Sequence, residues 1–139
     1  MNEEKIRWLK SYRGLLAEIQ RLQREIERWR SIAEKVTPTL SAVRFTVPDG
    51  SRIENAVEKI DTLHTRFADA LSALVDRRMA IETAVDAIPD ERLRLILHYR
   101  YIDGMTFDAI AEKMCFSSKW TRKLHKSALE FLEVPPEQV

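Results

Sequence analysis

Four basic side chains near the C-terminal end of the sequence have the spacing to form one cationic surface. They are Lys119, Arg122, Lys123 and Lys126, at offsets of 0, 3, 4 and 7. At about 100° per residue, a helix places all four on one stripe. No acidic residue lies between Ser117 and Ser127. Ammonium and guanidinium groups gathered in this way are suited to binding anions such as phosphate groups.

The opposite face of the same segment is predicted to be buried. It carries Thr121, Leu124, Ala128, Phe131 and Leu132. Ser117 or Ser118 is a suitable N-cap, because a serine hydroxyl can accept hydrogen bonds from the free N–H groups of a first helical turn. We therefore expect a helix over about 118–132 with one packed face and one basic face.

Two shorter helices are predicted immediately before it. The sequence from Asp90, DERLRLILHYRYIDG, places Leu93, Ile96 and Leu97 inward. Gly104 is the expected left-handed C-cap of this helix, and Thr106 is the expected N-cap of the next one, TFDAIAEKM. The inward residues of that helix are Phe107, Ile110, Ala111 and Met114. Three short helices, the last two joined by a tight turn, are the layout of a helix-turn-helix domain.

The N-terminal half is predicted to be two long helices. From about Glu3 to Val36, apolar residues alternate at spacings of 3 and 4, which is the heptad pattern of a coiled coil. They are Tyr12, Leu15, Ile19, Leu22, Ile26, Trp29, Ala33 and Val36. Thr37 to Gly50 contains two prolines and a Pro-Asp-Gly turn signal, so we expect a loop, with a β-favouring patch at Val43, Phe45 and Val47. The second helix has an apolar residue every seven positions, at Ile53, Ile60, Phe67, Leu74, Ile81 and Ile88.

These segments predict an all-α protein with two domains. Residues 1–88 form a long antiparallel helical hairpin, and residues 89–139 form the helix-turn-helix domain. The composition, 45% hydrophobic and 32% charged with 3 Gly, agrees with this class. The apolar face of the second helix is wider than one partner helix needs, since Val57, Leu71 and Val85 flank the repeat. We expect homo-oligomerisation through residues 1–88, and the alternative is that residues 89–139 fold back over this face.

The C-terminal segment resembles region 4 of sigma-70-type transcription factors. The resemblance covers residues 89–133, where a leucine-rich helix ends in Tyr-Ile-Asp-Gly, the next helix carries an Ile-Ala pair, and the last helix contains an Ala-Leu doublet. The residues that match the pattern are Tyr101, Ile102, Asp103, Gly104, Thr106, Ile110, Ala111, Ala128 and Leu129. The long helical half ahead of it is similar in layout to phage regulators of the ArpU and RinA kind.

The resemblance implies double-stranded DNA as a partner. The exposed start of the recognition helix would enter the major groove with Ser118, Lys119, Trp120 and Lys123, while Arg122 and Lys126 would contact the backbone. The candidate DNA-binding residues are Ser117, Ser118, Lys119, Trp120, Arg122, Lys123 and Lys126. Trp120 departs from the arginine or polar residue common in the family, and we favour a partly buried core position for it over a base contact.

The sequence gives little support for catalysis. The histidines, His64, His98 and His125, lie on different predicted helices without metal-ligand spacing, and the one cysteine, Cys115, is expected to be a small apolar residue at the helix turn. We therefore expect no enzyme activity, no catalytic residues, no metal and no cofactor. No signal peptide or membrane-spanning run is present in this sequence, so we expect a cytoplasmic protein with no membrane partner. The resemblance to phage regulators implies a bacterial host cell.

Three functions remain open from the sequence. The first is a sequence-specific transcriptional regulator of phage or prophage late genes, with RNA polymerase as a candidate second partner. The second is a DNA-packaging protein like a small terminase subunit, which would assemble as a closed ring. The third is a helical interaction module without DNA binding, which the near-neutral charge of the C-terminal third allows.

Overall fold

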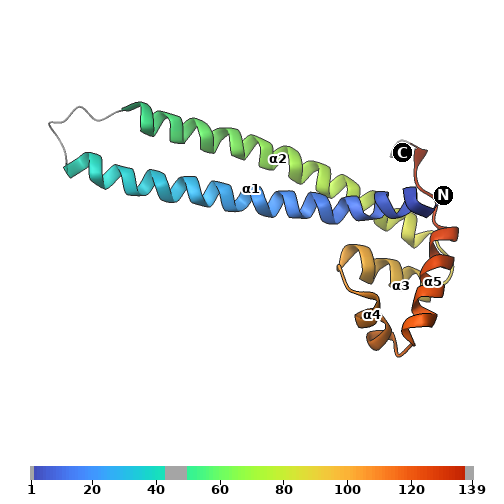
Figure 1. Cartoon of the computed structure of the whole chain (residues 1–139). Helices are drawn as coiled ribbons and strands as arrows, with labels where there is room; N and C mark the ends of the chain where they lie inside the picture. The colour runs from blue at the N-terminus through green and yellow to red at the C-terminus, as the bar shows by residue number, and fades with distance from the viewer. Residues whose placement is uncertain (1, 43–49, 137–139) are drawn as a thin grey trace. The chain divides into compact units, whose positions relative to one another are not determined.

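The protein is built from helices throughout the part of the chain that the structure describes. The structure is a computed structural model that describes residues 2–42 and 50–136, with side chains placed in 2–35 and 52–136. Its elements are α1 (Asn2–Ala42), α2 (Gly50–Asp86), α3 (Glu91–Leu97), a π-helical turn η1 (His98–Ile102), α4 (Phe107–Met114) and α5 (Ser118–Phe131), as Figure 1 shows. The predicted all-α class, with long N-terminal helices followed by a C-terminal helical domain, is confirmed.

The chain folds into two compact units. Unit 1 is Met1–Leu16 with Ala73–Val139, and unit 2 is Ala17–Ser72. This partition differs from the division at residue 88 that the sequence suggests. The reason is that the first turns of α1 and the C-terminal end of α2 are packed into the core of unit 1.

Helix α1 is longer than the sequence predicts. It continues to Ala42, although a loop is expected from Thr37 onward. Pro38 therefore lies inside a helix, where it removes one backbone donor but does not prevent the residues after it from keeping helical geometry. The predicted β-favouring patch at Val43, Phe45 and Val47 lies outside the described residues.

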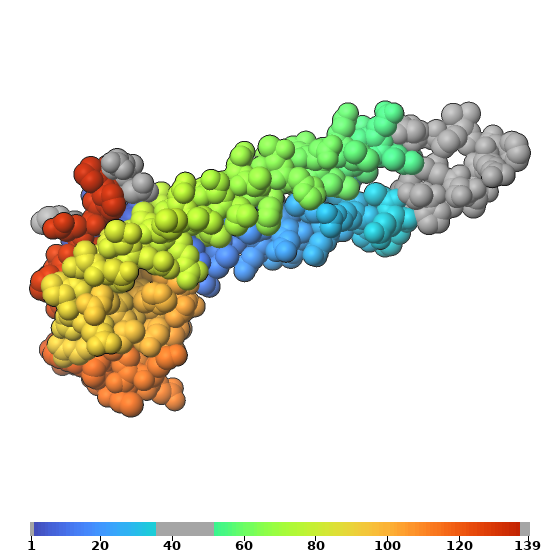
Figure 2. Space-filling model, turned by 180° about the vertical axis from the view of Figure 1, so that it is seen from behind, coloured from blue at the N-terminus to red at the C-terminus, as the bar shows by residue number. Residues whose placement is uncertain are grey.

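Unit 2 is a two-helix unit with a narrow core. Leu22 and Ile26 of α1 and Leu63 of α2 are buried together, and Trp29, Phe67 and Ala70 pack against them. The two helices lie side by side in Figures 1 and 2. The alternating 3 and 4 spacing thus marks the buried stripe of α1 correctly, because residues at that spacing share one side of a helix.

A second apolar stripe on α2 stays in contact with solvent. Within unit 2, Val57 is 49% exposed and Leu71 is 42% exposed. In unit 1, at the C-terminal end of α2, Ala84 and Val85 are buried in one core with the C-terminal helices, as the alternative of a fold-back predicts for that end.

Unit 1 has a larger core to which every helix of the unit contributes. Trp8, Leu9 and Tyr12 come from α1, and Ile81, Ala84, Val85 and Ile88 from the end of α2 and the residues after it. The C-terminal helices add Leu93, Ile96, Leu97, Tyr101, Ile102, Ile110, Leu124, Ala128, Leu129 and Leu132. In Figure 2 the yellow end of α2 and the orange helices form one continuous surface. The first turns of α1 are therefore part of the scaffold of the helix-turn-helix.

Hydrogen bonds from α1 reinforce this packing at two places. The Lys5 ammonium donates to the backbone oxygen of Leu129, at 2.7 Å, near the C-terminal end of α5. The Arg13 guanidinium donates to the backbone oxygen of Ile102, at 3.3 Å, at the end of η1. Both carbonyls belong to helix ends, where acceptors lack intrahelical partners and favour a cation.

The corner after η1 depends on glycine, as predicted. Gly104 has a φ of 74°, and a Cβ placed there would lie 2.7 Å from the Arg13 guanidinium. A side chain would meet both a left-handed backbone and this guanidinium. The conformation turns the chain from η1 into α4.

Candidate nucleic-acid interface

Two hydroxyl caps define where the helices of the helix-turn-helix begin. Thr106 caps α4 by accepting a hydrogen bond from the Ala109 N–H at 3.1 Å. Ser117 caps α5 by accepting from the Trp120 N–H at 3.0 Å. Both caps agree with the sequence, and of the two candidate serines it is Ser117 that performs this task. Its hydroxyl is therefore engaged with the backbone of its own helix.

The turn between α4 and α5 contains a residue in an unusual backbone conformation. Cys115 has a φ of 59°, in the left-handed region. Its N–H donates to Glu112 O at 3.2 Å, and the Phe116 N–H donates to Ala111 O at 2.9 Å. This pair of bonds is a Schellman motif, which usually has glycine at the left-handed position. Cys115 lies at the helix turn, where the sequence places it, and it is exposed.

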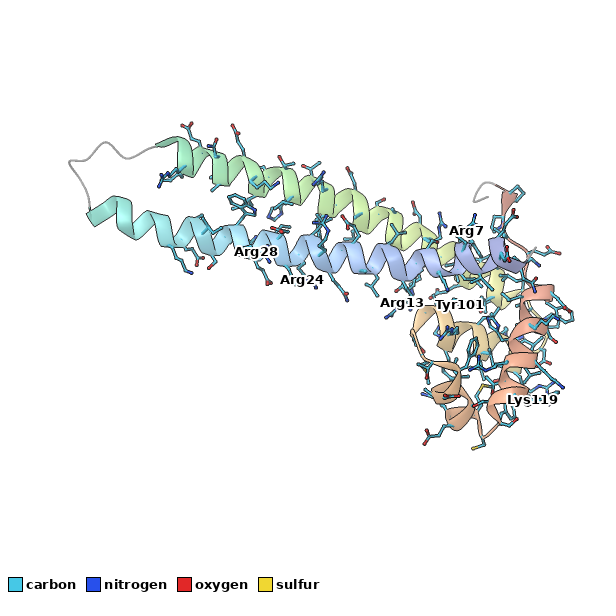
Figure 3. All side chains as sticks on the ribbon, viewed as in Figure 1. Arg7, Arg13, Arg24, Arg28, Tyr101 and Lys119 are labelled. Atoms are coloured by element: carbon cyan, nitrogen blue, oxygen red, sulfur yellow. The ribbon has the colours of Figure 1, made fainter. Side chains whose placement is uncertain are left out.

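The four predicted cations share an exposed surface on α5. Lys119, Arg122, Lys123 and Lys126 are all exposed, while Thr121, Leu124 and Ala128 on the other side are buried. Among the residues that the structure describes, none of the four forms an ion pair with a carboxylate. Figure 3 shows Lys119 on the outer side of the helix. Their positive charge is thus available to an external anion.

The prediction for Phe131 was wrong. It is 58% exposed, whereas Leu129 and Leu132 are buried at 2% and 1%. The helix ends at this point, since Leu132 has an extended backbone. Phe131 is the last residue of α5, and Leu129 and Leu132 are the residues that are buried in the core at this end.

Ser118 connects the two helices of the motif. Its hydroxyl donates to the Asp108 carboxylate at 2.7 Å, which joins the first turn of α5 to the first turn of α4. The side chain therefore has a structural partner on the same surface as the cations. A DNA contact by Ser118 would compete with this bond.

An aromatic residue of α4, Phe107, gathers two guanidinium groups. The Arg100 guanidinium lies 4.3 Å and that of Arg122 5.0 Å from the centre of the Phe107 ring. Such cation–π contacts are worth about 0.5–1 kcal/mol when exposed. The arrangement restrains Arg122, and it adds Arg100 as a cation that the sequence reading missed. The sequence signal that could have indicated this contact is that Arg100 and Phe107 lie close to Gly104, on either side of the turn that it forms.

His125 takes part in this cluster as a packing residue. Its ring lies edge-on to Phe107, with centroids 4.9 Å apart, and its Nε2 is 2.7 Å from the Tyr101 hydroxyl. Burial, together with the positive charge of Arg100, lowers the pKa of His125 to about 4. The imidazole is therefore neutral at pH 7. Burial also raises the pKa of Tyr101.

Trp120 is on the surface, which corrects the favoured core interpretation. Its side chain is 43% exposed. The core of unit 1 is filled on this side by Leu124 and Ala128, one and two turns further along α5. Trp120 lies at the edge of the cationic stripe, about 100° from Lys119 around the helix axis.

The comparison with protein families agrees with this geometry. Residues 90–132 match the family model of sigma-70, region 4. The matched region 4 segment starts at the Asp90 cap of α3 and ends just after α5, so it covers the three-helix part of unit 1. The resemblance of this segment to sigma-70 region 4 is confirmed, and the match supports DNA binding in general. Searches of curated proteins and of solved structures gave no match.

None of the helices in the described ranges is long and apolar enough to span a lipid bilayer.

Proposed function

We propose that the protein is a sequence-specific DNA-binding regulator of transcription that reads the major groove with the N-terminal part of α5. The observation that carries the proposal is the set of four exposed cations on one stripe of α5, without carboxylate partners among the described residues, inside the region 4 match. A helix of this kind fits the major groove, where Lys can bond guanine O6 and N7.

The proposed contacts divide by position along the helix. Lys119, Trp120 and Lys123 reach base edges, because they lie in the first turns of α5. Arg122 and Lys126 bind backbone phosphates, and Phe107 restrains the Arg122 guanidinium for that contact. Phosphate contacts set the register of the protein on the duplex, and base contacts provide the sequence preference. The role is one of binding, without catalysis.

The protein also assembles, in this proposal, as a homo-oligomer through residues 1–88. Support comes from the exposed apolar residues of α2, Val57, Leu71, Val75 and Met79, which are 49%, 42%, 47% and 62% exposed. Val75 and Met79, four residues apart in unit 1, share one side of α2, and exposed apolar side chains that lie together favour an interface. A dimer would bind two half-sites about one turn of DNA apart, or a multiple of it.

The target genes in this proposal are late genes of a phage or prophage, in the cytoplasm of the bacterial host. The support is the layout of long helices ahead of a region 4 match. The same match makes RNA polymerase a candidate second partner.

Selection of duplexes from a random-sequence pool tests this function. The expected result is enrichment of one sequence, with two half-sites if the protein is a dimer. The affinity for the enriched duplex should fall with salt, with a log–log slope of about −0.9 for each phosphate neutralised. A pool without enrichment, bound at the same affinity as the starting pool, contradicts sequence-specific binding.

A further inference from the structure

Trp120 combines three properties that are rarely found together on a surface helix. It is large and apolar, it is 43% exposed, and it lies in the first turn of the helix with the cationic stripe. Its indole N–H has no hydrogen-bond partner among the described residues, and the Ser117 hydroxyl bonds its backbone and not its ring. A large apolar surface and the one donor of the ring are therefore open to an external partner.

The neighbours of Trp120 show which surface its ring belongs to. Lys119 precedes it, and Lys123 is one turn further on the exposed side of α5. Thr121 next to it is fully buried, with its hydroxyl bonded to Ser117 O at 2.9 Å, so the backbone here is fixed. Trp120 is thus next to Lys119 along the chain and about 60° from Lys123 around the helix axis. It lies at the N-terminal end of α5, the end that enters the major groove in helix-turn-helix proteins.

The chemistry of an indole limits what it can recognise there. It has a broad apolar face and one donor, and it has no acceptor. In the major groove, thymine is distinguished by its C5 methyl group, which apolar side chains contact, beside the O4 acceptor. An indole can meet both features, whereas cytosine offers a donor that the indole cannot accept.

We propose that Trp120 is a specificity-determining residue that contacts the C5 methyl group of one thymine in the target site. The inference rests on the proposed function, since it presupposes that α5 lies in the major groove. It goes further by naming the base and the atom that one side chain recognises.

Replacement of thymine by deoxyuridine tests the proposal, because it removes the methyl group and nothing else. Each thymine of the enriched duplex is replaced in turn, and wild type, Trp120→Ala and Phe131→Ala are titrated by fluorescence anisotropy. Phe131 is the matched control: it is the other exposed aromatic residue of α5 and lies on nearly the same side, about 16 Å further along the axis. Melting temperatures of the three proteins should be equal within a few degrees.

The expected result is a loss of affinity for wild type at one thymine position. The loss should be about fourfold, the equivalent of about 0.8 kcal/mol for one buried methyl group. Phe131→Ala should show the same loss at the same position, and Trp120→Ala should bind more weakly than wild type and not distinguish the two bases there.

Three outcomes overturn the proposal, and they differ in what they say about the function. If wild type binds the enriched duplex but tolerates every deoxyuridine, the methyl contact is wrong and DNA binding stands. If Trp120→Ala retains the wild-type loss, another side chain reads the methyl group. If no duplex is enriched at all, the proposed function fails and the thymine contact fails with it.

Discussion

Unit 1 and unit 2 contain parts of the same two long helices, but these helices are packed to different extents in the two units. In unit 1 the ends of α1 and α2 are buried with α3, η1, α4 and α5 in one core, with hydrogen bonds from Lys5 and Arg13 to helix ends. In unit 2 the core cluster between the same helices has three buried side chains, Leu22, Ile26 and Leu63, and three that pack against them. How many side chains of each stretch of these helices are buried depends on the neighbouring helices as well as on the heptad pattern of the stretch itself.

The contrast separates two tasks. Unit 1 fixes α5 so that its cations keep one arrangement, which a binding surface needs. Unit 2 leaves Val57 and Leu71 exposed, which suits contact with a second copy. Changes in the two units should therefore have different consequences.

Removal of one core side chain from α1 should damage unit 1 most. Leu9 is fully buried, so Leu9→Ala should lower the free energy of unfolding by about 2–5 kcal/mol. The matched control, Val57→Ala, removes an exposed side chain from α2 and should change it by less than about 0.5 kcal/mol in the monomer. Urea denaturation at low protein concentration measures both. Equal effects of the two changes contradict the assignment of the first turns of α1 to the core of unit 1.

Charges on the exposed stripe of unit 2 should disrupt assembly and spare the fold. Val57→Asp with Leu71→Asp should raise the dissociation constant of the oligomer at least tenfold, because a carboxylate in an apolar interface is costly. Sedimentation velocity gives the mass. The mutant should keep the helix content of wild type, measured by circular dichroism. An unchanged oligomer mass shows that this stripe is not the interface.

Acid should destabilise unit 1 through His125. Its pKa is about 4 in the folded protein and about 6.5 when unfolded, so the unfolded chain binds the proton more readily. The stabilising contribution is complete above pH 6.5 and is lost as the pH falls through 4. Between pH 7 and pH 5, wild type should lose about 1–2 kcal/mol more than His125→Gln, allowing for the partly exposed ring.

Urea denaturation of wild type and His125→Gln at both pH values measures this effect. A pH dependence that is identical in wild type and His125→Gln contradicts the neutral, packed imidazole.

The smallest effect is expected at the turn between α4 and α5. A left-handed conformation costs a non-glycine residue about 1–2 kcal/mol, and glycine removes this cost. Glycine also makes the unfolded chain more flexible, which lowers the free energy of unfolding and offsets part of the gain. Cys115→Gly should therefore raise the free energy of unfolding by about 0.5–1 kcal/mol. Cys115→Ala keeps the strain and should stay close to wild type. A destabilising Cys115→Gly is incompatible with the positive φ of this residue.

Local signals in the sequence were sufficient for most of the elements. The Thr106 and Ser117 caps and the left-handed Gly104 follow from the preferences of single residues, and the structure has all three. The heptads predicted which side of α1 is buried in unit 2, since that depends on spacing alone.

Packing between distant segments was not predictable in the same way. Trp8 and Leu9 enter the core of unit 1 beside residues more than seventy positions away, and no periodicity in α1 reports that. The Phe107 contacts with Arg100 and Arg122 likewise join three different helices. Trp120 looked like a core residue by type, but the core on its side is already occupied by Leu124 and Ala128.

The most direct test of the central claim is an anisotropy titration of the enriched duplex with Lys119→Ala/Lys123→Ala. Both side chains are exposed on the first turns of α5, so the double mutant should fold as wild type does and bind at least tenfold more weakly. The control is Arg24→Ala, an exposed cation of α1 labelled in Figure 3, which should bind as wild type does. Equal affinities of the double mutant and wild type would show that the exposed face of α5 is not the DNA-binding surface.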